Sequence, residues 1–379
     1  MKKLTILALH LGYGGVEKSI VALANMLSDT YDVEIISSYK LYDASVFPIN
    51  KKVKINYLIT KYRPNQQEWK NAIKKLRLIK FLKETYNGIM TLFLRRYTMI
   101  QAIKNSDADI IVSTRSLFNT WLGYYGRGKA LKIGWEHNHY HGDLNYAKQI
   151  IKSARDLNYL VLVSDSLRAF YKKPLKPYKC KCVYIPNIID EIPDKTSSLT
   201  KNKIISIGRL SREKGYEDLL DVMKLVNDKE PNWTLDIIGD GAQKNLLGDR
   251  IFEKEMSGYI KLHGYQKKDY INTLLKDSSI YVMSSVTESF GIVLLEAMSY
   301  GIPCVAFDSA EGANDLIRNN VNGYLIENRN KEEMANKIIE LINDKDKRIE
   351  MGNQGRMTSL KYTPDIIKKD WMRILKKRG

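Results

Sequence analysis

Residues 4–27 read LTILALHLGYGGVEKSIVALANML, an apolar run followed by a glycine-rich turn and a second apolar stretch. Residues 4–9 have the composition of a buried strand, and residues 19–27 have the periodicity of a helix. A strand, a tight turn and a helix in this order point free amides and the positive end of the helix dipole into a crevice, where an anion or a hydroxyl-rich ligand could bind. A turn that needs glycine only for its backbone conformation explains the stretch equally well.

The stretch does not match the loop that binds nucleoside triphosphates. That loop has a glycine directly before its lysine, so that backbone amides wrap the β-phosphate. Here Glu17 precedes Lys18. We therefore expect Lys18 to be a surface residue on the first turn of the helix.

Strand-like and helix-like segments alternate along the whole chain, which predicts parallel sheets wound on both faces. In the first half the predicted strands are residues 4–9, 33–37, 110–113, 132–135 and 159–163. In the second half they are residues 203–207, 234–238, 259–262, 280–283, 303–306 and 323–326. Two such series predict two doubly wound domains, with a linker in the proline- and serine-rich stretch that follows Pro186.

The charge is placed unevenly along the chain. Residues 1–190 hold 31 Lys and Arg against 14 Asp and Glu, whereas residues 191–379 hold 30 against 29. A general bias toward lysine would affect both halves equally. The excess therefore predicts that the first half meets a polyanion, either nucleic acid or an anionic membrane face.

The cysteines and the N-terminus favour an intracellular protein. Cys180, Cys182 and Cys304 form neither a disulfide framework nor a zinc-binding pattern. The start MKKLTILALHL has the lysines of a secretory signal, but its apolar run is short, contains His10 and lacks a cleavage site, so we interpret it as the first strand. We expect a reducing cytoplasm.

Two loops of the second half carry residues suited to a nucleotide sugar. IGRLSREKG, residues 207–215, places Arg209 and Lys214 between a strand's carboxyl end and a helix N-terminus, where they can neutralise a diphosphate. A solvated basic loop is the alternative. The glycine turn at Gly241, in IIGDGAQKNLL, brings another backbone to the same edge of the sheet.

The most specific motif is TESFGIVLLEAMSYGIPCVAFD, residues 287–308. Glu288 lies in the turn after a strand. The amides of Phe290, Gly291 and Ile292 open a helix toward the cleft that two doubly wound domains form at the carboxyl ends of their strands. A carboxylate and free amides suit sugar hydroxyls, and Glu296, about 12 Å further along the helix, can reach a ribose. Two solvated glutamates on a surface helix are the alternative.

With these motifs the chain resembles the retaining glycosyltransferases of family 4, of the bacterial polysaccharide and glycolipid biosynthesis type. The resemblance rests on GGVEKSIVALA, the EHN segment at 136–138, the IPN segment, GRLSREKG, GDG, and the two glutamates of ESFGIVLLEAMSYGIP. It implies the GT-B fold, α/β with two doubly wound Rossmann-like domains facing a central cleft. The implied domains are residues 1–188 on the acceptor side, a linker at 189–199, residues 200–360 for the nucleotide sugar, and a C-terminal helix, 361–379, that crosses back.

The resemblance also implies a role for each donor-binding residue. Arg209 and Lys214 hold the pyrophosphate, Glu288 with the amides at 290–292 binds the sugar, and Glu296 holds the ribose. The loop of Gly14 and Gly15 closes over the phosphate and sugar end, and the base lies near residues 263–265, which include Tyr265, mainly on backbone groups. The complete donor-binding set is Gly14, Gly15, Arg209, Lys214, Gly241, Tyr265, Glu288, Ser289, Phe290, Gly291, Ile292 and Glu296.

His137, in WEHNHYHGD, is predicted to face the cleft and to touch donor sugar and acceptor, as a histidine near this place often does in the family. The catalytic set is therefore His137, Arg209, Lys214 and Glu288. Loop packing is the alternative, and a metal bound by the histidines of this loop is weakly supported. Asp107 and Asp109 form a D-x-D pair, but they precede a strand and so lie away from the cleft.

The reaction implied is transfer of a hexose or N-acetylhexosamine from a nucleoside diphosphate sugar, most simply a UDP-sugar, with retention. Two cations and helix amides can stabilise the leaving diphosphate, so we expect neither a metal nor any other cofactor. No carboxylate is placed as a nucleophile, which favours front-face attack. An epimerase of the same fold, a phosphorylase, and a basic nucleic-acid-binding protein are the alternatives, and the last would leave both glutamates without a role.

Residues 70–96 hold eight Lys and Arg against one Glu, interleaved with apolar residues. The pattern predicts a basic amphipathic helix on an anionic membrane surface, with a solvated face packed on the core as the alternative. We therefore expect a lipid-linked or glycan acceptor of the cell envelope, no nucleic-acid partner, and a cytoplasmic protein that is peripheral on the inner face of the cell membrane.

Overall fold

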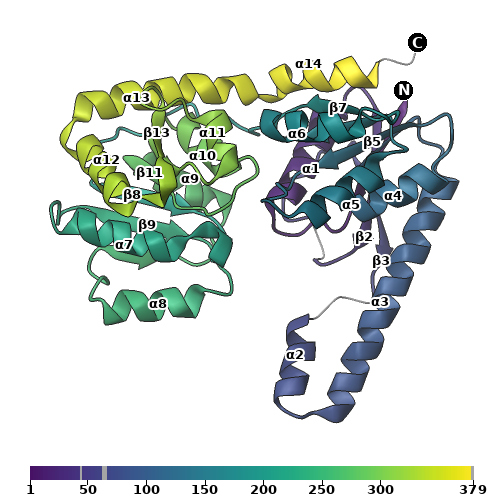
Figure 1. Cartoon of the computed structure of the whole chain (residues 1–379), viewed down its shortest axis with the longest axis horizontal. Coiled ribbons are helices and arrows are strands. Elements are labelled where there is room, and N and C mark those ends of the chain that lie inside the picture. The colour runs from purple at the N-terminus through teal and green to yellow at the C-terminus, as the bar shows by residue number, and fades with distance from the viewer. Residues whose placement is uncertain (43–44, 62–65, 377–379) are drawn as a thin grey trace. The chain divides into compact units, whose positions relative to one another are not determined.

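The structure is a computed structural model that describes residues 1–42, 45–61 and 66–376 (Figure 1). The chain forms two compact units. Unit 1 comprises Met1–Ile185 together with Lys368–Gly379, and unit 2 comprises Pro186–Ile367.

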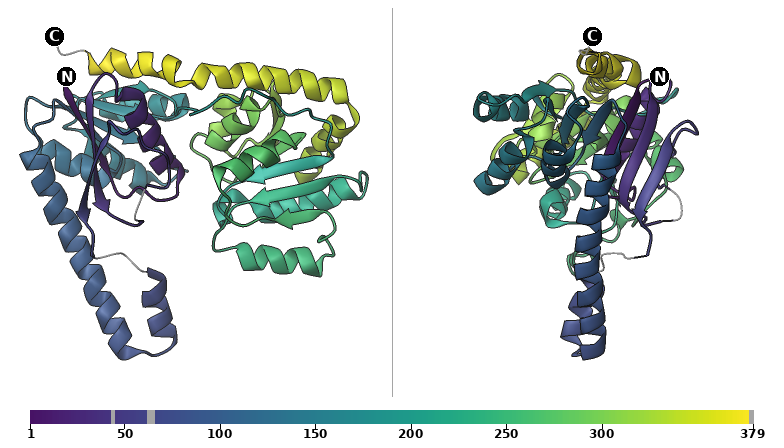
Figure 2. Two further views of the ribbon diagram at one scale, coloured as in Figure 1. Left: turned by 180° about the vertical axis from the view of Figure 1, so that it is seen from behind. Right: turned by 90° about the vertical axis from the view of Figure 1, so that its right-hand side faces the viewer.

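Unit 1 contains, among its described residues, a parallel seven-stranded sheet of order β3-β2-β1-β4-β5-β6-β7. The strands are β1 (Lys3–Ala8), β2 (Asp32–Tyr39), β3 (Lys54–Ile59), β4 (Ile110–Ser113), β5 (Leu131–Glu136), β6 (Tyr159–Leu162) and β7 (Lys181–Tyr184). The helices are α1 (Gly15–Leu27), α2 (Gln66–Lys74), α3 (Leu78–Asn105), α4 (Ser116–Tyr125), α5 (Leu144–Ala154) and α6 (Asp165–Leu175). Helices cover both faces of this sheet (Figure 2).

Unit 2 contains a parallel six-stranded sheet of order β10-β9-β8-β11-β12-β13 in the described part of the chain. The strands are β8 (Lys203–Ile207), β9 (Thr234–Ile238), β10 (Ile260–Leu262), β11 (Ile280–Met283), β12 (Cys304–Phe307) and β13 (Gly323–Ile326). The helices are α7 (Tyr216–Asn227), α8 (Lys244–Glu253), α9 (Lys268–Lys276), α10 (Ile292–Ser299), α11 (Glu311–Leu316), α12 (Lys331–Asn343) and α13 (Lys345–Ser359), with short 3₁₀ turns η1 (Arg212–Lys214), η2 (Glu327–Arg329) and η3 (Leu360–Tyr362).

The central strands are apolar throughout because helices cover both sides of each sheet. All four residues of β4, β11 and β12 are buried, as expected for strands of a doubly wound sheet. In both sheets the strand order reverses once, between β1 and β4 in unit 1 and between β8 and β11 in unit 2. Ligands bind outside the carboxyl ends of the strands at such reversals.

The predicted fold class is confirmed, because both units are parallel Rossmann-like α/β domains. Four strands of unit 2, β8, β9, β11 and β13, coincide with their predicted bounds. Two strands of unit 1 were not predicted: β3, KINYLI, and β7, KCVY. Both lie at sheet edges, where charged and polar side chains are tolerated, so they lack the apolar run that marks a central strand.

The basic stretch 70–96 is not the single surface helix that we predicted. It contains the second half of α2 and the first two thirds of α3, with a break at residues 75–77 where Leu76 has φ 49°. The two helices form a hairpin that projects from the sheet of unit 1 (Figure 1). The apolar periodicity was correctly interpreted as helical, but no glycine or proline marks the turn.

The segment after Pro186, predicted as a linker, packs on unit 2. The buried Arg348 guanidinium donates to the carbonyl of Leu199 at 3.0 Å, and Arg356 donates to the carbonyl of Pro193 at 2.9 Å. The division into an acceptor-side and a nucleotide-sugar domain stays a prediction, since contacts assign no ligand to either unit.

The C-terminal helix α14 (Pro364–Leu375) begins in unit 2, and its last two turns belong to unit 1. There the buried Trp371 ring meets Trp135 of β5 edge to face, with centroids 5.2 Å apart. Residues 377–379 of the predicted C-terminal helix lie outside the described residues. None of the described helices has both the length and the apolar character needed to cross a bilayer.

Gly352 of α13 lies in close contact with the backbone that follows α10 in unit 2. A Cβ added to Gly352 would overlap the carbonyl oxygen of Gly301, next to α10, whereas one added to Gly248 in α8 would meet nothing within 4 Å. We expect Gly352→Ala to destabilise unit 2 by about 1–2 kcal/mol, because overpacking outweighs the gain in helix propensity.

The matched variant Gly248→Ala should instead stabilise by about 0.5–1 kcal/mol. Thermal unfolding checks both, at roughly 2–4 °C per kcal/mol. Equal shifts in the two variants would mean that α13 and the Gly301 backbone are not in close contact.

Candidate active site

In unit 2 the candidate site lies where the strand order reverses, at the carboxyl ends of β8 and β11. The loop after β8 carries Arg209 and Lys214, and the loop after β11 carries Glu288. The Lys214 ammonium bonds to a Glu288 carboxylate oxygen, and both side chains are mostly buried. The two residues that we predicted from separate motifs are therefore brought together as an ion pair.

Further hydrogen bonds fix the two loops against each other. The Ser284 hydroxyl donates to the carbonyl of Lys214 at 2.9 Å, and the Val286 amide donates to the carbonyl of Glu213 at 2.8 Å. Arg329 braces the second loop by donating to the carbonyl of Ser285 at 2.9 Å. The backbone that presents Lys214 and Glu288 is thus held before any ligand binds.

Gly215 permits this close approach. It has φ 62°, in the left-handed region, and a Cβ at this position would overlap the carbonyl oxygen of Ser284. Since α7 begins at the next residue, the same glycine sets the direction in which the helix leaves the loop.

The N-terminus of α10 supplies backbone donors beside Glu288. Gly291 has φ 84° and precedes the helix, and the Phe290 ring is buried against Tyr362 at a centroid distance of 5.8 Å. Within the described residues, the amides of Phe290, Gly291 and Ile292 donate no hydrogen bond. They are therefore suited to bind an anion or a hydroxyl at a helix N-terminus.

The remaining predicted donor residues are spread along the same edge of the sheet. Ser289 adjoins Glu288, and Glu296 lies partly buried in α10. Gly241 follows β9, next to β8, and a Cβ added at this position would overlap the carbonyl oxygen of Leu210. Tyr265 follows β10, two strands from β8, with a half-exposed ring. Arg209 is exposed.

In unit 1 a second polar cluster lies at the reversal between β1 and β4. Glu17, in the first turn of α1, is buried, and its carboxylate accepts a hydrogen bond from Arg115 at 3.2 Å and lies 3.6 Å from His10 Nδ1. Its carboxylate fills the space that a side chain at Gly14 would occupy. Burial lowers the pKa of His10, which the nearby Glu17 raises and Arg115 lowers.

Glu136 and His137, at the end of β5, extend this cluster. The buried Glu136 carboxylate accepts from the Asn138 amide at 2.8 Å and from the Tyr146 hydroxyl at 3.0 Å, and burial raises its pKa. Burial, aided by the charge of Arg115, lowers the pKa of His137 to about 3. The His137 ring lies 4.2 Å from that of Trp135, and its buried Nε2 has no hydrogen-bond partner among the described residues. His137 is therefore a neutral imidazole at physiological pH.

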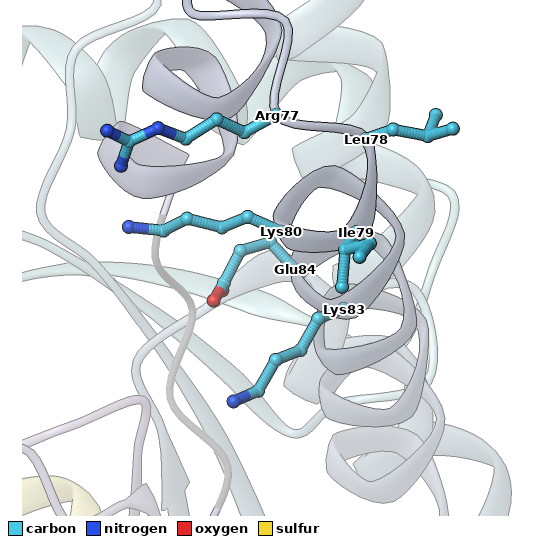
Figure 3. A pocket seen from close by; sticks show the side chains of 6 residues that line it. All are labelled: Arg77, Leu78, Ile79, Lys80, Lys83 and Glu84. Atoms are coloured by element: carbon cyan, nitrogen blue, oxygen red, sulfur yellow. The ribbon is translucent and has the colours of Figure 1, made fainter.

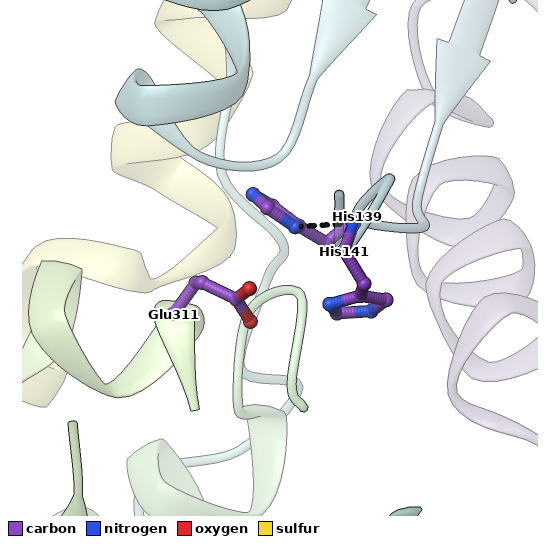
Figure 4. A group of neighbouring side chains, drawn as sticks. All are labelled: His139, His141 and Glu311. Carbon is purple, nitrogen blue, oxygen red and sulfur yellow. Dashed lines mark hydrogen bonds between the residues drawn. The ribbon is translucent and has the colours of Figure 1, made fainter. Parts of the chain in front are cut away.

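The loop after His137 is ordered by its own contacts. The His141 amide donates to His139 Nδ1 at 3.0 Å, drawn as a dashed line in Figure 4, and the two rings lie 4.8 Å apart. Asp143 caps α5 by accepting from the amides of Asn145 and Tyr146. Glu311, also drawn in Figure 4, belongs to unit 2, where it begins α11.

Sequence reasoning missed Arg115 and the burial of Glu17. Arg115 follows β4 as Arg209 follows β8. Its position just after a predicted strand could therefore have indicated that it belongs to a site. Asp107 and Asp109 lie at the amino ends of the strands, where they contact the side chain and the amide of Lys3. Their position agrees with the interpretation that this pair does not belong to the site.

Comparisons with known proteins match several glycosyltransferases. Residues 188–358, which lie within unit 2, match the family model described as glycosyl transferases group 1. An uncharacterized glycosyltransferase of Haemophilus influenzae is 26% identical over 99% of this chain and 100% of its own length. A poly(ribitol-phosphate) alpha-N-acetylglucosaminyltransferase of Staphylococcus aureus is 26% identical over 92% of this chain and 69% of its own.

A solved structure extends the likeness to the fold of both units. A variant of S. aureus TarM, in complex with fondaparinux, alpha-GlcNAc-glycerol and UDP, superposes with a TM-score of 0.78 at 19% identity, over 99% of each chain. The comparisons support a glycosyltransferase of the GT-B fold. The cluster at the ends of β8 and β11 lies within the residues that the family model matches.

The buried neutral His137 of this glycosyltransferase predicts a pH-dependent stability. The unfolded chain binds a proton below the ordinary histidine pKa of 6.5, whereas the folded chain does not until about pH 3. Stability therefore falls as the pH falls through this interval, and from pH 7 to pH 5 His137 alone costs about 2 kcal/mol.

The variant His137→Asn should lose less stability than the wild type over the same interval. Glu136, whose raised pKa acts in the opposite direction, is retained in both proteins. Urea unfolding at the two pH values measures the difference. Parallel losses in the two proteins would mean that His137 is protonated in the folded state.

Proposed function

We propose that the protein is a retaining, metal-independent glycosyltransferase of the family 4 type. It transfers a hexose or an N-acetylhexosamine from a nucleoside diphosphate sugar, most simply a UDP-sugar, to a glycan or lipid-linked acceptor of the cell envelope. The UDP and the GlcNAc derivative in the TarM complex, and the N-acetylglucosaminyltransferase name of the S. aureus relative, support this choice of donor.

One observation carries the proposal. Cations, a carboxylate and amides that donate to no described residue all lie at the strand-order reversal of unit 2. Arg209 and Lys214 suit a diphosphate, and Glu288 with the amides at 290–292 suits the hydroxyls of a sugar. When a donor binds, Lys214 can exchange Glu288 for phosphate, which leaves the carboxylate to accept hydrogen bonds from the sugar.

The chemistry assigned to these residues is mainly electrostatic. As the bond between the anomeric carbon and the phosphate oxygen breaks, negative charge builds up on the diphosphate, where Arg209, Lys214 and the helix dipole stabilise it. The leaving phosphate oxygen takes the acceptor's proton, and the acceptor attacks from the same face, so the anomeric configuration is retained. His137, neutral and with Nε2 unpartnered among the described residues, is assigned to a sugar or acceptor hydroxyl.

Because two cations and a helix N-terminus do the electrostatic work, we expect turnover to persist after divalent metals are removed. The measurement is the rate of UDP release in EDTA, compared with the rate in added Mg²⁺ or Mn²⁺. A rate that drops more than about 10-fold in EDTA and recovers with metal would contradict metal independence.

The acceptor is assigned to unit 1 because that unit carries the positive charge. Residues 1–190, which contain all of unit 1 except its C-terminal segment, have an excess of 17 positive charges, 31 against 14, which suits an anionic bilayer and a phosphate-linked acceptor. We propose that the enzyme works in the cytoplasm, peripheral on the inner face of the cell membrane.

A panel of radiolabelled nucleotide sugars, with and without a lipid-linked or glycan acceptor, tests the function itself. A transferase releases nucleoside diphosphate and labels the acceptor, whereas an epimerase of the same fold changes the sugar without any acceptor. Binding of nucleic acid with no turnover of any donor would favour the third class, which assigns no role to Glu288 or Glu296.

Substitutions in the loop after β8 test the site. We expect Arg209→Ala to lower kcat about 100-fold or more, since it removes a cation that acts on the leaving diphosphate. Arg212→Ala is the matched control: it removes an exposed arginine of the same loop and should keep wild-type turnover. Glu296→Ala should mainly raise KM for the donor. If Arg209→Ala turned over donor as fast as the control, the diphosphate would have to bind elsewhere.

A further inference from the structure

The hairpin of α2 and α3 is a rigid element of unit 1 that projects beyond the sheet (Figures 1 and 2). The Trp69 ring of α2 packs 5.8 Å from Phe81 of α3, and its Nε1 donates to the Thr85 hydroxyl at 3.0 Å. Lys80 and Glu68 form an ion pair across the two helices. The C-terminal part of α3 is fixed to the core through the buried Met99 and Ile103. The hairpin therefore holds its tip away from the sheet.

The tip of the hairpin exposes most of three large aliphatic side chains to solvent, which is unusual for a helix that contacts only water. Leu76, Leu78 and Ile79 are 92%, 69% and 86% exposed. An exposed apolar stripe continues from the tip along α3, at intervals of three or four residues. The stripe consists of Ile79, Leu82, Tyr86, Ile89, Phe93 and Tyr97. Large contiguous apolar surface of this kind marks an interaction site.

Positive charge accompanies the apolar tip and the hairpin behind it. Residues 66–97 contain eight Lys and Arg against Glu68 and Glu84, a net charge of +6. At the tip, the cationic ends of Arg77, Lys80 and Lys83 point to one side, while Leu78 points away from them (Figure 3). Aliphatic side chains next to a cluster of cations suit a surface that is apolar inside and anionic at its rim.

We propose that the α2–α3 hairpin docks this protein on an anionic phospholipid bilayer, with Leu76, Leu78 and Ile79 entering the acyl region. The neighbouring cations, Lys74, Lys75, Arg77 and Lys83, then lie at the level of the lipid phosphates. A second copy of the chain is a poorer occupant, because it would bring +6 against +6. Nucleic acid would use the cations but leave the aliphatic tip in water.

This geometry differs from a basic helix that lies flat on the membrane. The tip makes the deepest contact, and the stripe on α3 leads from the tip back toward the sheet of unit 1. The inference rests on the membrane association proposed above, names the element that makes the contact, and is tested without turnover. Failure of vesicle binding would leave the donor chemistry untouched, and failure of donor turnover would leave the docking untouched.

The test is co-sedimentation of the full chain with vesicles of phosphatidylcholine, alone or with roughly 30% phosphatidylglycerol. We expect binding to the anionic vesicles only. The charge variant Lys74→Gln/Lys75→Gln/Arg77→Gln should weaken it on the order of 100-fold, at about fivefold for each cation lost. Its matched control, Lys172→Gln/Lys173→Gln/Lys176→Gln, removes three exposed lysines of unit 1 outside the hairpin and should bind as the wild type.

The apolar variant Leu76→Ser/Leu78→Ser/Ile79→Ser keeps every charge and should bind at least about 10-fold more weakly. Its control, Leu246→Ser/Phe252→Ser/Met357→Ser, changes exposed apolar residues of unit 2. An environment-sensitive dye on Leu76→Cys should shift to the blue on anionic vesicles, whereas the same dye on Phe252→Cys should not. All altered positions are exposed, and thermal unfolding verifies that each variant is folded.

Several results would overturn the proposal. Equal binding to neutral vesicles, or wild-type binding by both hairpin variants, would show that the hairpin is not an anionic-membrane anchor. Hairpin-dependent oligomers in sedimentation velocity, without vesicle binding, would assign the stripe to a second copy of the chain. Hairpin-dependent binding of an oligonucleotide, again without vesicle binding, would assign the cations to nucleic acid.

Discussion

In a parallel sheet all strands end at the same edge, and both polar clusters of this protein depend on that constraint. Arg209 and Glu288 are 79 positions apart in sequence, yet they follow adjacent strands, β8 and β11. In unit 1 the same constraint brings Arg115 and His137 to one edge, after the adjacent strands β4 and β5. Right-handed crossovers, which put a helix between successive strands, make this edge the one that loops can build on without disturbing the core.

The two polar clusters differ in how their charged groups are stabilised. In unit 2 Lys214 and Glu288 neutralise each other, and both side chains keep some exposure to water. In unit 1 Glu136 and His137 are buried, so desolvation disfavours the charged form of each and shifts their pKa values in opposite directions. Glu136 gains two hydrogen bonds, whereas His137 Nε2 gains none from the described residues. The imidazole is thus the group in unit 1 best suited to a hydroxyl from outside.

The sequence alone predicts most of the fold, because central strands and their glycine turns have strong local signals. The edge strands β3 and β7 escaped prediction, since lysines and partial exposure hide their pattern. Two motifs predict the residues of the unit 2 site. The ion pair between Lys214 and Glu288, however, depends on the strand order, which no local sequence pattern predicts. Arg115 and the buried Glu17 have the same origin. The break between α2 and α3 also depends on packing, with Trp69 against Phe81, rather than on a helix-breaking residue.

The order of elements along the chain has a consequence for how the protein is made. His137 packs against Trp135, and Trp135 meets Trp371, which belongs to unit 1 but follows the whole of unit 2 in the sequence. A ribosome that synthesises this chain therefore delivers the last aromatic ring of unit 1 only after it has completed unit 2. Until then Trp135 lacks its edge-to-face partner, and a nascent chain with a finished second unit still has an unfinished first one.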